Sequence, residues 1–315
     1  MASSAPSPAG PPRAFQEPSQ RSRSALLLIS LRPEQWTKNL IVFAAALFGG
    51  QLTHPAALVA AAATFLIFCA LSGAVYLFND VADRVSDQRH PLKRERPIAS
   101  GALSPGLAMA AGGTLAVGAV AAATAVDPML PVVAGAYFAL LLSYSFFLKH
   151  LVIIDALTIA GGFVLRAAAG AVAVGVPISH WLLVCTTLLA LFLSFSKRRH
   201  ELTLLAEGAT DHRRILHEYS PYLLDQMIAV VTASTLVAYA VYATSAETAQ
   251  RLGSTRLGLT IPFVLYGIFR YLYLVHQKRA GGSPAALLVT DGPLLACVAL
   301  WGLAVAVILY TPLGR

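Results

Sequence analysis

The amino-acid sequence predicts an all-α protein, a polytopic bundle of nine transmembrane helices. Of its 315 residues, 57% are hydrophobic and only 12% are charged, whereas soluble domains carry about 25% charged residues. The mean hydropathy of the chain is +0.68. Apolar runs of about 20 residues, the length that crosses a bilayer as a helix, recur from one end of the chain to the other. These observations indicate an integral membrane protein and exclude an ordinary soluble domain.

The chain divides into a short tail and one membrane domain. Residues 1–24 are mostly Ser, Pro, Ala and Arg, which predicts a disordered tail, and the apolar run after them is too short for a signal peptide. Residues 25–315 are interpreted as a single transmembrane domain. The first apolar run is the shortest, so eight spans are the alternative to nine. The predicted spans are 39–53, 56–78, 105–126, 129–148, 152–174, 178–196, 224–244, 257–276 and 286–310.

Lys and Arg are concentrated on one side of the predicted bundle. With an inner N-terminus, all 23 of them fall in inner segments or within a turn of one, except Arg166, Arg251, Arg256 and Arg315. Inner loops rich in Lys and Arg predict a cytoplasmic face. The N-terminus and the long polar connections are therefore expected in the cytoplasm. Topology and attraction to anionic headgroups explain the net charge of +8, which gives no indication of nucleic-acid binding.

An acidic pattern follows the second predicted span, in the stretch YLFNDVADRVSDQRHPLKRERPIASG. If the helix continues past the span, four oxygen-bearing side chains share an arc of about 100°: Asn79, Asp80, Asp83 and Asp87. Carboxylates that converge at a low-dielectric boundary repel one another unless a cation neutralises them. Hard oxygen ligands suit Mg²⁺, which also binds substrate phosphates. The pattern predicts a Mg²⁺ site, and ordinary interfacial acids neutralised by neighbouring arginines are the alternative.

A basic strip comes directly after the acids, with Lys93, Arg94 and Arg96 close together. A metal ion cannot neutralise all the charge of a polyphosphate, and ammonium and guanidinium groups bind phosphate oxygens directly. We expect this strip to contact the phosphates of a substrate held by the metal. For each single residue, the positive-inside bias alone is the alternative.

These residues carry a resemblance to a known family. N-D-x-x-D-x-x-x-D after a membrane helix resembles the first aspartate-rich motif of the UbiA superfamily of intramembrane prenyltransferases, and the resemblance extends from Arg32 onward. It implies nine helices with cytoplasmic cap loops, a diphosphate bound through Mg²⁺, and a lipid-facing channel for a polyprenyl chain. The superfamily's second motif, D-x-x-x-D after the sixth helix, is replaced here by FSKRRHEL. Cations in place of carboxylates favour a donor other than an ordinary prenyl diphosphate.

Within the superfamily, the sequence is most similar to the decaprenyl-phosphate phosphoribosyltransferases. Six blocks occur in the same order: LRPEQWTKN, NDVADRVSD running into HPLKRERPIASG, YSFFLKH, Arg166, KRRHEL, and RYLYLVHQK with GGSPAALLVTD. Gly292 is a departure, because similar sequences often have arginine there. The resemblance implies Mg²⁺-dependent transfer of 5-phosphoribose from phosphoribosyl diphosphate to a polyprenyl phosphate, with release of pyrophosphate. It also implies a bacterial-type inner membrane, a cytoplasmic active site and a function in cell-envelope biosynthesis.

The chemistry of that reaction agrees with the side chains that the sequence offers. The nucleophile would be a phosphate oxygen, which is largely ionised near pH 7. No strong general base is then required, and no Ser-His-Asp or Cys-His set is evident from the sequence.

Candidate site residues follow from the motifs and the resemblance. The expected metal ligands are Asn79, Asp80, Asp83 and Asp87. The predicted catalytic set is Asp80, Asp83, Lys93, Arg96, Lys197 and Arg198, and the predicted substrate-binding set adds Gln35, Lys38, Asn79, Asp87, Arg94, Tyr144, Lys149, Arg166 and Glu201. Because a charge inside a span is costly, Arg166 is expected to face the cavity with Asp155 or a substrate phosphate as its partner. For Tyr144, Lys149 and the segment of Lys38, interfacial anchoring is the alternative.

Two other functions remain open from the sequence. The same fold would support transfer of a prenyl group from a prenyl diphosphate to an aromatic acceptor, which the basic KRRHEL block disfavours. A non-enzymatic transporter is the second, although transporters more often distribute ionisable groups through the membrane midplane. The length of the polyprenyl chain and the formation of a homo-oligomer are left open.

Overall fold

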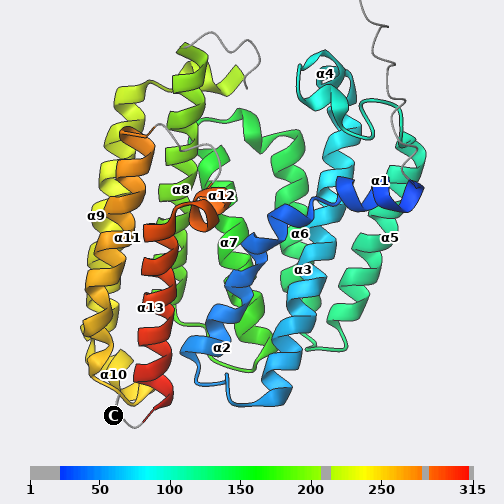
Figure 1. Ribbon diagram of the computed structural model, residues 1–315. Helices are drawn as coiled ribbons and strands as arrows, with labels where there is room; N and C mark the ends of the chain where they lie inside the picture. The colour runs from blue at the N-terminus through cyan, green and yellow to red at the C-terminus, as the bar shows by residue number, and fades with distance from the viewer. Residues whose placement is uncertain (1–21, 207–213, 279–283, 312–315) are drawn as a thin grey trace, which may run out of the picture.

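The protein is an all-helical bundle, seen in a computed structural model that describes residues 22–206, 214–278 and 284–311. Every regular element in these ranges is a helix, as the sequence predicts. Figure 1 shows the long helices side by side, with α1 (Arg23–Ser30) lying across one end of the bundle. Of the predicted tail 1–24, residues 1–21 lie outside the described ranges, and α1 already begins at Arg23.

Within the described ranges, seven helices are long and apolar enough to cross a membrane. Several begin where the sequence places a cap and a proline together: the hydroxyls of Ser104 and Ser220 accept backbone N–H groups at the starts of two of these helices, and proline is the first helical residue. The seven helices are α3 (Pro55–Ala82), α5 (Pro105–Ala123), α7 (Ile154–Ala173), α8 (His180–Ala206), α9 (Pro221–Thr244), α11 (Ile261–His276, preceded by η5, Arg256–Thr260) and α13 (Gly292–Tyr310).

The other two predicted spans have a different form. Residues 39–53 fall on a 3₁₀ helix, η1 (Pro33–Phe43), and a single-turn helix, α2 (Ala44–Phe48). Residues 129–148 contain α6 (Leu130–Phe146), whose 17 residues are fewer than in each of the seven spans when η5 is counted with α11. The run 286–310 is divided at Asp291, which caps α13, so α12 (Pro284–Thr290) is separate. The remaining short helices are α4 (Arg84–Arg89), η2 (Lys93–Glu95), η3 (Leu148–His150), η4 (Arg214–Glu218) and α10 (Ala246–Leu252).

α7 joins two packed halves of the bundle. One core cluster links it to α3, α5 and α6 around Phe68 and Tyr137, and another links it to α8, α9 and α11 around Phe192. η1 packs against both α3 and α7. This packing requires glycine at Gly170, because a Cβ there would lie 2.0 Å from the carbonyl oxygen of Val42. The polar first residues of η1 are thereby held against the helices that carry the charged motifs.

Candidate functional site

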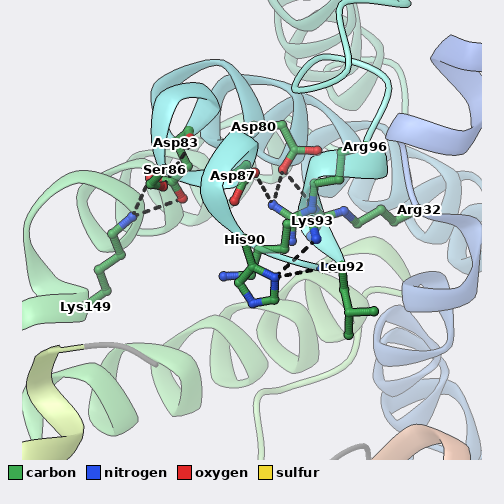
Figure 2. A network of polar contacts seen from close by, with 10 residues as sticks. All are labelled: Arg32, Asp80, Asp83, Ser86, Asp87, His90, Leu92, Lys93, Arg96 and Lys149. Carbon is green, nitrogen blue, oxygen red and sulfur yellow. Dashed lines mark hydrogen bonds and ion pairs between the residues drawn. The ribbon is translucent and has the colours of Figure 1, made fainter. Parts of the chain in front are cut away.

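The acidic motif lies where α3 ends and α4 begins. Helix α3 stops at Ala82, and Asp83 forms a non-helical junction (φ −86°, ψ 3°) before α4. The motif is therefore not one continuous helix, contrary to the expectation from its spacing. Figure 2 shows the result: Asp83 points toward Lys149, whereas Asp80 and Asp87 point toward Arg96.

Asp80 and Asp87 converge on one cationic nitrogen. Arg96 Nη1 donates to Asp80 Oδ1 at 3.1 Å and to Asp87 Oδ2 at 2.6 Å. Arg32 Nη2 also donates to Asp80 Oδ1 at 2.5 Å, and its guanidinium lies 4.7 Å from the centre of the Tyr76 ring. The side chains of the two aspartates are 3% exposed, but those of Arg32 and Arg96 are 22% and 26% exposed. Two buried aspartates are thus paired with arginines whose side chains are partly exposed to solvent.

Arg32 adopts a strained backbone conformation to make this contact. Its φ of 54° and ψ of 65° lie in the left-handed region, which is uncommon for residues other than glycine. Such residues cost about 1–3 kcal/mol each and cluster at functional sites. Arg32 is absent from the predicted site set, and the signal that could have identified it is its position directly before Pro33, at the start of a membrane segment.

The acid pair fits Mg²⁺ better than the predicted set of four ligands does. In the part of the chain that the structure describes, no three His, Cys, Asp or Glu side chains come together as a metal site. Asp83 pairs with Lys149, whose Nζ lies 3.2 Å from its Oδ1. Magnesium, however, is often held by one or two carboxylates and completed by water and substrate phosphates. Asp80 and Asp87 suit that role because both carboxylates already converge on one positive charge, and half-buried Asn79 adjoins Asp80.

A group of cations surrounds Lys38 on η1. The pKa of Lys38 is lowered to about 8, first by burial and then by the positive charges of Lys197, Arg166 and Arg32, while Glu34 acts in the opposite direction. The four cations belong to η1, the residue before it, α7 and α8, so segments far apart in the sequence meet here. Cations crowded together in a partly buried space favour an anionic ligand.

Arg166 is buried in α7 without a carboxylate partner among the described residues. Its Nε donates to Asn39 Oδ1 at 2.6 Å, and its Nη2 donates to Tyr137 Oη at 2.5 Å. Its guanidinium also lies 4.6 Å from the centre of the Tyr137 ring. Pairing with Asp155, one of the two expectations, is wrong, because Asp155 binds Arg198 instead. The charge of Arg166 is held by neutral groups, so a nearby anion would stabilise it.

Arg198 lies in a buried network in which each of its nitrogens is bonded. Its Nε donates to Asp155 Oδ2 at 2.8 Å, its Nη1 to Glu201 Oε2 at 2.8 Å, and its Nη2 to Tyr144 Oη at 3.4 Å. The side chain is only 2% exposed. Its neighbour Lys197 is 43% exposed, with Nζ 3.8 Å from Glu201 Oε1. The two predicted phosphate ligands thus have different surroundings, and only Lys197 is open to solvent.

The remaining predicted residues lie around these groups. Lys93 is half-buried on η2, and its backbone N–H donates to His90 Nδ1 at 3.2 Å, which helps to shape the loop seen in Figure 2. Arg94 is exposed on the same turn, and Gln35 is half-buried on η1. Their side-chain roles stay predictions.

Two tyrosines contribute to the site without a signal in the sequence. Tyr137 bonds Arg166 from the middle of α6, where an aromatic residue in an apolar run is typical of packing. Tyr219, in the segment between η4 and α9, donates to Asp155 Oδ1 at 2.9 Å.

Known proteins show the same sequence pattern over most of the chain. Residues 39–288 match the model of the UbiA prenyltransferase family. The decaprenyl-phosphate phosphoribosyltransferase of Mycolicibacterium smegmatis is 33% identical over 276 residues, which cover 84% of this chain and 86% of that protein. The protein of the same name from Corynebacterium glutamicum is 32% identical over 90% of this chain and 86% of its own length.

Solved structures show the same fold at lower identity. A UbiA homolog from Archaeoglobus fulgidus bound to DMAPP and Mg²⁺ has a TM-score of 0.68 and 19% identity, over 89% of this chain and 98% of its own. A digeranylgeranylglyceryl phosphate synthase has a TM-score of 0.64 and 14% identity, over 90% and 99%. From its sequence and its fold, the chain belongs to the UbiA prenyltransferase family of integral membrane transferases.

Proposed function

We propose that this enzyme transfers 5-phosphoribose from phosphoribosyl diphosphate to a polyprenyl phosphate and releases pyrophosphate. The observation that supports this most is the closeness of two charged groups, because Arg32 bonds Asp80 and its positive charge also lowers the pKa of Lys38. An acid pair suited to a metal ion and a neighbouring group of cations fit a reaction between two phosphate-bearing substrates. Relatives named decaprenyl-phosphate phosphoribosyltransferase, at 32% and 33% identity, support this pair of substrates.

The donor diphosphate is assigned to the acid pair. Asp80 and Asp87, with Asn79 beside them, would hold Mg²⁺, which supplies charge neutralisation for the diphosphate when it is bound. In the ligand-free chain the guanidiniums of Arg32 and Arg96 neutralise the same carboxylates. When the donor binds, these guanidiniums turn to its phosphate oxygens, for which their planar donor geometry is suited.

The acceptor phosphate is assigned to the group of cations formed by Lys38, Arg166 and Lys197. An oxygen of the lipid phosphate attacks C1 of the ribose and forms the new C1–O bond. The bond from C1 to the diphosphate oxygen breaks, and its electron pair leaves with pyrophosphate. The anomeric centre is inverted, and no proton has to be removed because the attacking oxygen is already ionised near neutral pH. Arg32 and Arg96 stabilise the charge that develops on the leaving group.

The remaining charged residues are given supporting roles. Lys149, held by Asp83 at 3.2 Å, would bind a second phosphate of the donor from the side opposite Arg96. Arg198 has three partners, so we assign it to holding α8 against α7 rather than to phosphate contact. Glu201 would orient both Arg198 and Lys197.

We also propose nine membrane crossings, with the N-terminus and the site on the cytoplasmic side. The first crossing begins at Asn39, after the polar residues of η1, and continues through α2. The 17 residues of α6 rise about 1.5 Å each, which gives about 26 Å, close to the hydrocarbon core of about 30 Å. The bias of Lys and Arg toward one end supports the orientation.

One transfer assay tests the proposal. Purified protein is incubated with labelled phosphoribosyl diphosphate, a polyprenyl phosphate and Mg²⁺, and label is measured in the organic phase. We expect label to move into lipid, and chelation of the metal to abolish the transfer. A parallel incubation with a labelled prenyl diphosphate and an aromatic acceptor is the decisive control. Transfer in that arm alone would identify an ordinary prenyltransferase, and no transfer in either arm would refute the enzymatic proposal.

A further inference from the structure

The backbone between η3 and α7 takes a strained turn at Ile153. This residue has φ 68° and ψ −43°, and the N–H of Ile154 donates to the carbonyl oxygen of Val152 at 2.7 Å. A three-residue turn with positive φ is rare and strained, and for a β-branched residue it is a clear outlier. Strain of this kind persists only where surrounding contacts hold it, and it is concentrated at functional sites.

The contact that holds the turn comes from Tyr219, which is far away in the sequence. The N–H of Ile153 donates to Tyr219 Oη at 2.7 Å, and the same hydroxyl donates to Asp155 Oδ1 at 2.9 Å. Tyr219 is buried, and burial first of all raises its pKa to about 12. The hydroxyl therefore keeps its proton at neutral pH and can serve both bonds at once.

The turn separates two residues through which this segment meets the site. Lys149, four positions before Ile153, lies on η3 and pairs with Asp83. Asp155, two positions after it, lies in the first turn of α7 and pairs with the buried Arg198. A change in the turn would therefore alter the distance between the two ion pairs.

We propose that Tyr219 is a positioning residue, whose hydroxyl holds the strained turn at Ile153 and thereby fixes Lys149 and Asp155 relative to each other. The inference rests on the proposed function, in which Lys149 binds a substrate phosphate. Through Tyr219, the packing of the segment before α9 affects the geometry of a site on the other half of the bundle. Tyr219 itself makes no contact with substrate in this proposal.

The first test is a rescue experiment measured as transfer rate. Tyr219→Phe keeps the ring and removes both bonds, and we expect kcat to fall by about 10- to 100-fold, the range that small misplacements cause. Ile153→Gly in the Tyr219→Phe background should recover much of the loss, because glycine adopts positive φ without strain. Ile153→Val in that background keeps the β-branch and should recover nothing. The Ile153 side chain is exposed, so its truncation removes little packing.

Tyr222→Phe is the matched control, because Tyr222 is an exposed tyrosine three residues after Tyr219, at the start of α9. It should leave transfer unchanged. The proposal is overturned if Tyr219→Phe is as active as the parent protein, or if Ile153→Gly rescues no better than Ile153→Val.

The second test needs no substrate, so it separates this inference from the proposed function. Hydrogen exchange of the segment 149–156 is compared in the parent, Tyr219→Phe and Tyr222→Phe proteins. Loss of the acceptor for the Ile153 N–H should speed exchange only in Tyr219→Phe. Faster exchange in Tyr219→Phe, when the parent protein itself transfers no phosphoribose, would refute the proposed function and leave the positioning role of Tyr219 intact. Unchanged exchange in Tyr219→Phe would overturn the positioning role of Tyr219, even if the parent protein is active.

Discussion

The two arginine networks of this molecule use the same side chain in opposite ways. In the network of α3 and α4, Arg32 and Arg96 are 22% and 26% exposed, and among the described residues Arg96 bonds both carboxylates through Nη1 alone. In the network of α7 and α8, Arg198 is 2% exposed and bonds through Nε, Nη1 and Nη2. The first network presents partly exposed guanidiniums to another partner, whereas in the second every nitrogen of a buried guanidinium already has a partner.

This difference in the exposure of the arginines distinguishes a network suited to binding substrate from one suited to holding helices together. The carboxylates of the α3–α4 network are buried, but its arginines are partly exposed, so water can solvate the guanidiniums while they exchange one anionic partner for another. A fully buried pair is costly to break, because the remaining charge is left unpaired in a medium of low dielectric constant. We infer that the α3–α4 network opens to receive substrate, whereas the α7–α8 network keeps its bonds throughout the reaction.

The largest expected effect on activity is from Asp80→Asn. The amide keeps the shape of the side chain but removes the charge that attracts both guanidiniums and Mg²⁺. We expect transfer to fall by about 10²–10³-fold, the usual cost of losing one electrostatic contact at a reacting centre. The measurement is the initial rate of label transfer across a Mg²⁺ titration. Asp127→Asn, in the connection between α5 and α6, is the matched control, and equal activity of the two variants would contradict the assignment.

Arg198→Met should have the largest effect on stability. It leaves the buried Asp155 without its cationic partner, and breaking a buried pair in this way costs about 3–5 kcal/mol. We expect a clear fall in the thermal unfolding midpoint in detergent. Arg96→Met should lower that midpoint by less, because the Arg96 side chain is 26% exposed and Asp80 keeps Arg32, and it should also lower transfer. If Arg198→Met unfolds at the parent temperature, the α7–α8 network is not a scaffold.

Gly170→Ala should act on η1 through packing. The added Cβ would lie 2.0 Å from the Val42 carbonyl oxygen, so α7 and η1 must separate. Overpacking of this kind costs about 1–3 kcal/mol, and it should also reduce transfer by displacing Lys38. Gly113→Ala on α5 is the matched control, because a Cβ there meets nothing within 4 Å. Identical unfolding midpoints and rates for the two variants would contradict the packing of η1.

The smallest expected effect is on the pH profile. Burial and neighbouring cations lower the pKa of Lys38 to about 8, so its positive charge is lost as the pH rises through that value. Since kcat/KM reports on the free enzyme, kcat/KM for an anionic substrate should fall a few-fold between pH 7 and pH 9. Lys38→Arg stays charged and should keep a flatter profile. The same fall in Lys38→Arg would show that another group titrates.

Much of the fold follows from local patterns, and the errors have physical causes. Caps and prolines mark the starts of α5 and α9, and the apolar runs give the seven long helices. The spacing of the acids implies a continuous helix, but the helix is interrupted at Asp83, whose side chain pairs with Lys149 on another segment. A 3₁₀ helix such as η1 has no hydrophobic period that distinguishes it from a short α-helix, so its form is invisible in the sequence.

The site was predicted less completely than the fold, because the role of each side chain depends on its contacts with residues from distant segments. KRRHEL presents Lys197 and Arg198 as equivalent phosphate ligands, and only the packing of α8 on α7 buries one and exposes the other. Tyr137 and Tyr219 become recognisable only when their partners from distant segments are known.

A structure determined with phosphoribosyl diphosphate and Mg²⁺ bound tests the difference between the two networks most directly. We expect the guanidiniums of Arg32 and Arg96 to leave Asp80 and Asp87 for phosphate oxygens, while the Arg198–Asp155 bond keeps its length of 2.8 Å. Bound donor with Arg96 still on both carboxylates, or with Arg198 released from Asp155 onto phosphate, would contradict this division of roles.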